Sequence, residues 1–307
     1  MGWTDTGGSP SDGGGGKRLR PTLTLLACES AGGDVEMALP VAVALEYVHN
    51  FSLIHDDLED GDRFRHHRPT VWAVWGDATA IVSGNAMLNV ADQAARRLSE
   101  RGVHPDVSLD AQRALTTGYL RMMEGQYLDI EFEARPSITV QEYLDMIERK
   151  TGALIESAIY LGALVGRPAG AGRELAEGFR MVGHDLGRIF QIRDDILGVW
   201  GGAETGKPVG ADIQRKKKAL PAVHALSHSA GAGRQRLTEI FAKKELTGSD
   251  VEDVLEIMEA MGTQDYCQSM AAERWQRARN VLKSLRIPTD AHREFEELGE
   301  FLLVRDS

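Results

Sequence analysis

The chain has 307 residues, and 35 Lys and Arg stand against 46 Asp and Glu, for a net charge of −11 with histidine neutral. At 42% hydrophobic residues it has enough apolar material for a large core, which excludes disorder over most of its length. The acidic balance argues against non-specific binding to nucleic acid, because that binding needs basic surface to displace counterions. A local basic pocket for a phosphorylated molecule remains compatible with it.

The cysteines and the apolar stretches indicate a cytoplasmic protein. Two cysteines, Cys28 and Cys267, are too few for a disulfide framework. The most apolar stretch, Gly152–Gly166, contains Glu156 and is shorter than the roughly 20 residues that span a bilayer. The first residues lack the charged start and apolar run of a signal peptide. We therefore expect no integral membrane segment.

Helical periodicity begins after a glycine-rich start. Residues 1–16 hold too little apolar surface to order themselves, so we predict a flexible tail. Beyond it, apolar residues recur at three- and four-residue steps, and Pro40 is predicted to start a helix. Long helical segments are predicted at 82–98, 110–132, 140–165 and 175–199. Few windows alternate with a period of two, so the predicted fold is all-α, one large bundle over residues 17–307.

Acidic residues follow apolar ones at residues 51–60. Asp56 and Asp60 are four residues apart, so on a helix they lie on one face, where two like charges are unfavourable. A divalent cation that bridges the carboxylates would explain the arrangement, and ligands that are all oxygen favour Mg²⁺. The alternative is an ordinary solvated helix face.

A second acidic cluster, Asp194 and Asp195, lies on a helix predicted to end near Gly198. Either cluster alone fits a solvated face, but two clusters with apolar flanks favour a common metal site. Basic residues accompany both clusters, which suggests that metal ions and cations hold a polyanion together. These basic residues are Lys17, Arg20, Arg65, Arg68, Lys207 and the run Lys216–Lys218. Surface charge balancing is the alternative for some of them.

In their order along the chain, these elements resemble the polyprenyl synthetase family, the trans-isoprenyl diphosphate synthases. The matching motifs are Gly16-Lys17-x-x-Arg20, His49 ahead of Ser52–His55, Asp56-Asp57-x-x-Asp60, Arg65 with Pro69-Thr70, Glu124-Gly125-Gln126, Lys150-Thr151-Gly152, Phe190-Gln191 with Asp194-Asp195, and Gly206-Lys207 through Gly210, Asp212 and Lys217. The resemblance implies a helical bundle of the isoprenoid synthase type around a central cavity. It also implies a homodimer and two acidic motifs that face each other.

The reaction implied by the resemblance is head-to-tail condensation of isopentenyl diphosphate with an allylic diphosphate. It places three Mg²⁺ ions on Asp56, Asp60 and Asp194, with Asp57 and Asp195 in support. It assigns the allylic diphosphate to Arg65, Lys150, Lys207 and Lys217. It assigns isopentenyl diphosphate to Lys17, Arg20 and His49. Thr151 and Gln191 would present oxygens to the allylic cation, and fixed cations and metals would stabilise the departing pyrophosphate.

Product length in this family is set by the cavity floor. Phe51 lies five residues before the first Asp of the first motif, and a bulky aromatic residue at this position resembles family members that make short-chain products. With no insertion between Asp56 and Asp60, the favoured product is C20 geranylgeranyl diphosphate. The alternative is that Phe51 is only a core aromatic.

The chain departs from the family pattern at three places. His66, followed by His67, stands where a second Arg after the first motif would contact isopentenyl diphosphate, although Arg68 could compensate. Gly198 ends the second motif where Asp is frequent. A glycine-rich segment stands where helices usually precede the first motif, so either the start is truncated or the entrance to the site is built differently.

Two other functions stay open on the same scaffold. A terpene cyclase would keep the metal motifs and lose the isopentenyl diphosphate site; His66 favours it, whereas Lys17, Arg20 and His49 oppose it. A non-catalytic regulatory subunit would not need the intact aspartates.

Overall fold

The computed structural model describes residues 18–66, 68–167, 173–202 and 208–305, and it confirms the all-α prediction. The predicted tail at 1–16, together with Lys17, His67 and Lys207, lies outside the described residues. The chain divides into two compact units. Unit 1 comprises Met1–Tyr119 and Ser157–Phe179, and unit 2 comprises Leu120–Glu156 and Arg180–Ser307. The single domain predicted over residues 17–307 stays a prediction.

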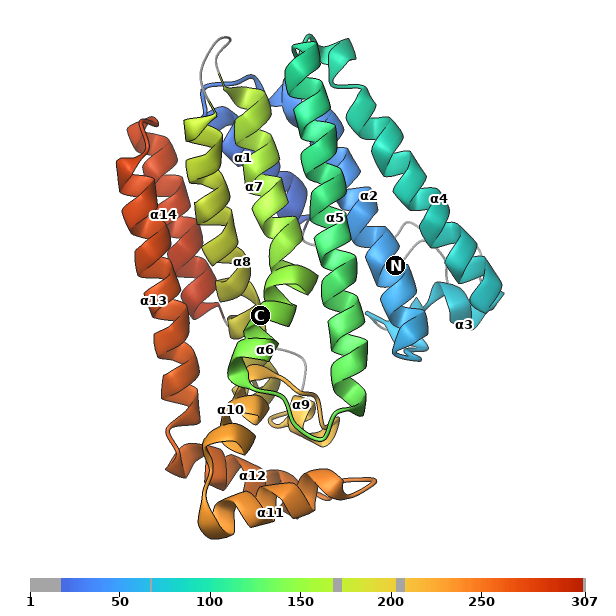
Figure 1. The fold of residues 1–307 in the computed structure, drawn as a ribbon, viewed down its shortest axis with the longest axis vertical. Helices are drawn as coiled ribbons and strands as arrows, with labels where there is room; N and C mark the ends of the chain where they lie inside the picture. Colours follow the sequence, from blue (N-terminus) through green and yellow to red (C-terminus); the bar gives the residue numbers. More distant parts are fainter. Residues whose placement is uncertain (1–17, 67, 168–172, 203–207, 306–307) are drawn as a thin grey trace. The chain divides into compact units, whose positions relative to one another are not determined.

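Unit 1 is built around one long helix, α2 (Val35–Glu59), which packs against α1 (Leu19–Ser30) and α4 (Asp77–Arg96). Figure 1 shows α2 and α4 side by side. The other elements with residues in unit 1 are β1 (Phe64–Arg65), β2 (Arg68–Pro69), α3 (Val71–Trp75), η1 (Ser99–Arg101), the first part of α5 (Pro105–Ala134) and most of α7 (Ala153–Gly166).

The start of α2 differs from the prediction. Pro40 was expected to open the helix, and this is wrong, because α2 begins at Val35 and contains Pro40. The Asp34 side chain caps the helix by accepting a hydrogen bond from the Glu36 backbone N–H at 3.0 Å. An N-cap at Asp34 fixes the start one turn earlier than the proline signal suggested.

A short hairpin follows the first acidic motif and was not predicted. Strand β1 pairs antiparallel with β2, with Arg65 opposite Arg68. The chain after it is tied back by Thr70, whose hydroxyl donates to the Asp62 carbonyl at 2.8 Å, and by Trp72, whose indole N–H donates to the same oxygen at 2.9 Å. The hairpin therefore holds Arg65 at a fixed place after α2.

Unit 2 contains α6 (Val140–Ile147), most of α8 (Glu174–Trp200), α9 (Ala211–Gln214), α10 (Leu220–His228), α11 (Gly231–Ala242), α12 (Gly248–Ala260), α13 (Thr263–Ser284) and α14 (Thr289–Val304). Helices α13 and α14 pack together, as do α10 and α6 (Figure 1). One apolar cluster joins Tyr143 and Ile147 of α6 to Ile192 of α8 and Leu220 of α10. Two members of this cluster, Tyr143 and Leu220, also bind Asp195 of the second acidic motif.

The four long helical segments are confirmed as parts of α4, α5, α6 with α7, and α8. The segment predicted at 140–165 is not a continuous α-helix, because a π-helical turn, η2 (Glu148–Gly152), lies between α6 and α7. Such widened turns are rare and frequently occur at functional sites.

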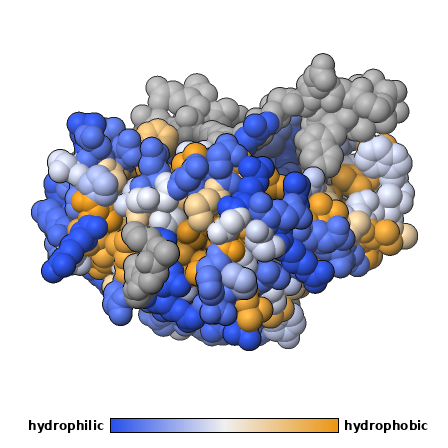
Figure 2. All heavy atoms as spheres, turned by 90° about the horizontal axis from the view of Figure 1, so that it is seen from above, coloured by the Kyte–Doolittle hydropathy of each residue, from blue (hydrophilic) through white to orange (hydrophobic). Residues whose placement is uncertain are grey.

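Helix α2 meets the criteria of length and composition for a membrane span, a feature that the sequence expectations did not include. Its 25 residues are long and apolar enough by length and composition, with 44% of the most apolar window buried within the structure. Core helices meet the same criteria, so the observation is weak evidence for a membrane segment. Hydrophilic residues dominate the face seen in Figure 2, with apolar ones between them.

Candidate active site

The first acidic motif ends helix α2 in unit 1. The Asp60 backbone N–H donates to the Asp56 carbonyl at 2.8 Å, so the two residues are one helical turn apart, as predicted. Asp60 is exposed, whereas the Asp56 side chain is 20% exposed. The motif therefore presents carboxylates at the end of a helix that is otherwise part of the core.

Arg65 holds the first two aspartates of this motif. Its Nε donates to Asp57 Oδ1 at 2.6 Å, and its Nη2 donates to Asp56 Oδ2 at 3.2 Å. Burial raises the pKa of Asp57 above its usual range, although Arg65 opposes the rise. The second carboxylate oxygen of Asp57 is buried and has no hydrogen-bond partner. Asp57 is therefore a buried partner of Arg65, and Asp56 is the more accessible of the two aspartates.

His49 and Phe51 lie on α2 below this motif. Burial, together with the charges of Arg20 and Arg65, lowers the pKa of His49 to about 2. A neutral His49 can donate a hydrogen bond to a phosphate but brings no positive charge. Phe51 is 4% exposed, with its ring edge-on to His55 at 5.1 Å.

His66 occupies the tight turn between β1 and β2. It is exposed and has a positive φ of 50°, a conformation that non-glycine residues seldom adopt. His66 therefore lies at the tip of the hairpin, whereas Arg65, the residue before it, lies in strand β1.

The second acidic motif lies on α8 in unit 2, and its two aspartates have different environments. Asp195 is fully buried and accepts hydrogen bonds from the Tyr143 hydroxyl, from Gln191 Nε2 at 3.0 Å and from the Leu220 backbone N–H at 3.2 Å. Burial raises the pKa of Asp195 to about 6, against the lowering influence of Lys217 and of these hydrogen bonds.

Asp194 is 42% exposed and forms an ion pair with Arg305, near the end of the described chain. The Arg305 guanidinium lies 4.3 Å from the centre of the Phe190 ring and donates to the Phe190 carbonyl at 3.2 Å. Arg193 holds the backbone of the same segment, since its Nε donates to the Arg305 carbonyl at 2.8 Å. Nothing in the sequence pointed to Arg305, because its partner is 111 positions away.

The π-helical turn carries two of the predicted site residues. Lys150 Nζ forms an ion pair with Asp129 of α5. The Thr151 hydroxyl donates to Gln191 Oε1 at 2.8 Å, and Gln191 in turn binds Asp195. The structure therefore joins Thr151, Gln191 and Asp195 in one hydrogen-bonded chain.

The basic run Lys216–Lys218 has divided roles. Lys216 and Lys218 donate to backbone carbonyls, including Lys243 for the first and Glu133 at 3.1 Å for the second. Lys217 Nζ instead lies 3.7 Å from Asp212 Oδ2. Desolvation lowers the pKa of Lys217, but Asp195 and Asp212 outweigh it, and the pKa is raised. Lys217 is thus the member of the run that faces carboxylates.

Gly198, the departure in the second motif, lies against Asp212. A Cβ built at Gly198 would overlap the carboxylate of Asp212, which is itself largely buried. The space that a side chain at position 198 would take is already filled by an aspartate from a later part of the chain.

The donor set fits Mg²⁺. Asp56 and Asp60 in unit 1, and Asp194 in unit 2, each offer accessible carboxylate oxygens, the ligand type that Mg²⁺ prefers. In the part of the chain that the structure describes, no three His, Cys, Asp or Glu side chains are grouped to hold a metal ion. Mg²⁺ usually needs only one or two carboxylates from the protein, because water and substrate phosphates complete its shell.

The fold and the paired aspartates define a member of a known family. The family model for polyprenyl synthetase matches residues 12–258, and the chain belongs to this family. It is accordingly a prenyltransferase, and the family is generally Mg²⁺-dependent.

Among its relatives, the chain is 36% identical over 311 residues to a (2E,6E)-farnesyl diphosphate synthase of Mycobacterium tuberculosis, an alignment that covers 100% of this chain and 84% of the relative. It is 39% identical to a geranylgeranyl diphosphate synthase of the same organism, with 91% of this chain and 78% of the relative covered. A polyprenyl synthetase structure from Streptomyces coelicolor matches with a TM-score of 0.90 at 36% identity, covering 99% of this chain and 89% of that one.

The contact between Arg305 and Asp194 leads to a prediction on metal affinity. Arg305→Gln removes the guanidinium that neutralises Asp194, so we expect Mg²⁺ to bind roughly two- to fivefold more tightly, the size expected for a partly exposed ion pair. Isothermal titration of the substrate-free protein measures this affinity. The control is Arg293→Gln, which breaks a surface pair with Asp290 on α14. Equal affinities in all three proteins would show that Arg305 does not compete with the metal.

Proposed function

We propose that this chain catalyses the head-to-tail condensation of isopentenyl diphosphate with an allylic diphosphate, most consistently to geranylgeranyl diphosphate (C20). One observation carries the proposal. In each acidic motif an accessible aspartate stands beside a buried, hydrogen-bonded one, Asp56 beside Asp57 and Asp194 beside Asp195. The buried members are held by donors within the fold, which leaves the accessible members to bind metal and diphosphate.

The allylic diphosphate is assigned to the aspartates and to nearby cations. When bound, Mg²⁺ would neutralise the diphosphate and stabilise it as a leaving group, and three ions are proposed from the family resemblance. Arg65, Lys150 and Lys217 each lie against carboxylates in the described structure, so their positive charges are held in place before substrate arrives. Lys207, outside the described residues, keeps the same proposed role.

The remaining site residues are assigned to isopentenyl diphosphate and to the cation. Arg20, with Lys17 outside the described residues, would supply the charge that binds isopentenyl diphosphate, and neutral His49 would donate a hydrogen bond. His66 is proposed to contact the same diphosphate. Thr151 and Gln191, held together at 2.8 Å, would present oxygens to the allylic cation. Pyrophosphate would take the final proton.

The proposed reaction predicts a large effect at Asp56. Asp56→Asn removes an accessible metal ligand, and we expect kcat/KM to fall by at least about 100-fold, as when a group that stabilises developing charge is removed. Turnover is measured with Mg²⁺, isopentenyl diphosphate and a C5, C10 or C15 allylic diphosphate, with mass spectrometry of diphosphates and volatile hydrocarbons.

The control for this experiment is Asp62→Asn, just beyond the motif, which is expected to stay active. A cyclic hydrocarbon formed without isopentenyl diphosphate would replace the proposal with a terpene cyclase. Full function of Asp56→Asn beside an active partner protein would indicate a regulatory subunit.

Phe51 is proposed as the floor that stops elongation at C20. Phe51→Ala is expected to shift products beyond C20, because it removes the bulk of the side chain. The control is Leu45→Ala, a fully buried residue of the same helix, which should lower the melting temperature without lengthening the product. If Phe51→Ala only destabilises the protein and leaves product length unchanged, Phe51 is a core aromatic.

We further propose a homodimer that uses helix α4. Val82 and Val90 are 67% and 40% exposed and lie about two turns apart, so they share a face of the helix. Val82→Glu is expected to convert dimer to monomer in light scattering after size exclusion. Phe301→Glu on α14, also at an exposed apolar position, is expected to leave the mass unchanged. A wild-type monomer would contradict the proposal.

A cytoplasmic location is proposed from the cysteines. Cys28 and Cys267 are both free and buried. Burial raises their pKa values to about 11 and about 12, and nearby acidic groups add to the rise. Both thiols therefore stay protonated, and it is their unpaired state that fits a reducing compartment.

A further inference from the structure

The π-helical turn η2 sends consecutive side chains to different neighbours. Arg149 Nη1 donates to Glu124 Oε2 of α5 at 3.0 Å, Lys150 binds Asp129 of α5, and Thr151 binds Gln191 of α8. The first residue of the turn, Glu148, has no role in the function proposed above. Its surroundings indicate why the turn has this geometry.

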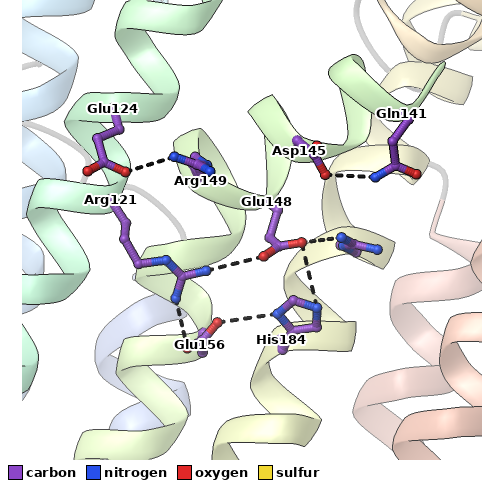
Figure 3. Close-up of polar contacts among 9 residues, drawn as sticks. Arg121, Glu124, Gln141, Asp145, Glu148, Arg149, Glu156 and His184 are labelled. Atoms are coloured by element: carbon purple, nitrogen blue, oxygen red, sulfur yellow. Dashed lines mark hydrogen bonds and ion pairs between the residues drawn. The ribbon is translucent and has the colours of Figure 1, made fainter. Parts of the chain in front are cut away.

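Glu148 lies among basic side chains that come from the helices on both sides of the turn (Figure 3). Arg188 of α8 forms an ion pair with its Oε2, and Arg121 Nη2 of α5 lies 3.4 Å from its Oε1. His184 Nε2 of α8 lies 3.7 Å from Oε2. The Arg188 side chain is only 10% exposed, so these charges are partly removed from water and interact more strongly than surface pairs.

The network closes through a second carboxylate, Glu156 of α7. Arg121 Nη1 donates to Glu156 Oε1 at 2.9 Å, and His184 Nδ1 lies 3.4 Å from Glu156 Oε2. Burial raises the pKa of Glu156, but His184 and Arg121 outweigh it, so the pKa is lowered and the group is ionised. Glu148 and Glu156 thus anchor the beginning of the turn and the helix after it to the same two side chains.

Two glycines bring the turn close to its neighbours. A Cβ built at Gly125 of α5 would overlap the backbone nitrogen of Lys150. A Cβ built at Gly187 of α8 would lie 2.7 Å from the Gly152 Cα. The backbone of η2 is therefore in close contact with α5 and α8, whose Arg121 and Arg188 also pair with Glu148.

We propose that Glu148 is a positioning residue, which fixes the π-helical turn between Arg121 and Arg188 and so orients Lys150 and Thr151 toward the allylic diphosphate. This inference rests on the roles proposed above for Lys150 and Thr151. A single π-helical turn is rare in proteins, so side-chain contacts that hold it in place matter for its geometry. Removing the negative charge of Glu148 therefore makes the turn more mobile, although no group that takes part in the reaction is removed.

The test uses Glu148→Gln, which keeps the shape of the side chain and removes its charge. In the ligand-free protein, hydrogen exchange of the amides at 148–155 is expected to become at least about tenfold faster, while α13 exchanges as before. In the full reaction kcat is expected to fall by about 10- to 100-fold, the size of a small misplacement of catalytic groups. The KM of the allylic diphosphate should rise, and that of isopentenyl diphosphate should not, a split that general destabilisation would not produce.

The matched control is Glu296→Gln on α14, which breaks a pair with Arg279 at 3.0 Å and is expected to change neither exchange at the turn nor either KM. Arg188→Lys is the second variant, should Glu148→Gln fold poorly, because it keeps the positive charge and loses the planar guanidinium. It is expected to show a smaller change of the same kind.

Unchanged exchange at 148–155 in both Glu148→Gln and Arg188→Lys would overturn the inference, even with a fully active wild-type enzyme. Equal changes in both KM values would also overturn it. A wild-type protein that elongates no allylic diphosphate would instead contradict the proposed function, and the exchange data would still decide whether Glu148 fixes the turn.

Discussion

The second acidic motif depends on one buried carboxylate, that of Asp195. Removing an ionisable group from water is costly unless donors surround it, and Asp195 is satisfied by α6, by α8 itself and by the first backbone N–H of α10. Burial nevertheless outweighs these donors and the charge of Lys217, so the pKa of Asp195 is raised. Because the donors come from three helices, the position of Asp194 beside it is fixed by the packing of unit 2 as a whole.

Unit 1 also combines a buried aspartate with an accessible one, but different groups bind the buried carboxylate. There a guanidinium, Arg65, satisfies the buried Asp57 and also contacts Asp56. One motif thus uses neutral donors and a backbone N–H, and the other uses a full positive charge. Each solution leaves one carboxylate at the surface of a helix end, so the two motifs reach a similar presentation through different chemistry.

Sequence reasoning predicted what is local or repeated. Apolar periodicity gave the all-α class and the long helices, and spacing placed Asp56 one turn from Asp60. Contacts between segments that are distant in the sequence could not be predicted. From the sequence alone, Tyr143 is only a candidate core residue, and Arg305 and Glu148 are ordinary charged residues. The π-helical turn was missed because one extra residue does not disturb the helical pattern. Pro40 misled because a capping Asp34 outweighs a proline signal.

The Gly198–Asp212 contact couples two positions that a motif search treats separately. A side chain at 198 would meet the Asp212 carboxylate, which is the movable end of a side chain, so it would displace a group that lies 3.7 Å from Lys217 Nζ. Substitutions at the two sites are therefore non-additive. Consensus design that introduced an aspartate at 198 alone would bring two carboxylates close together and would change the surroundings of Lys217 as well.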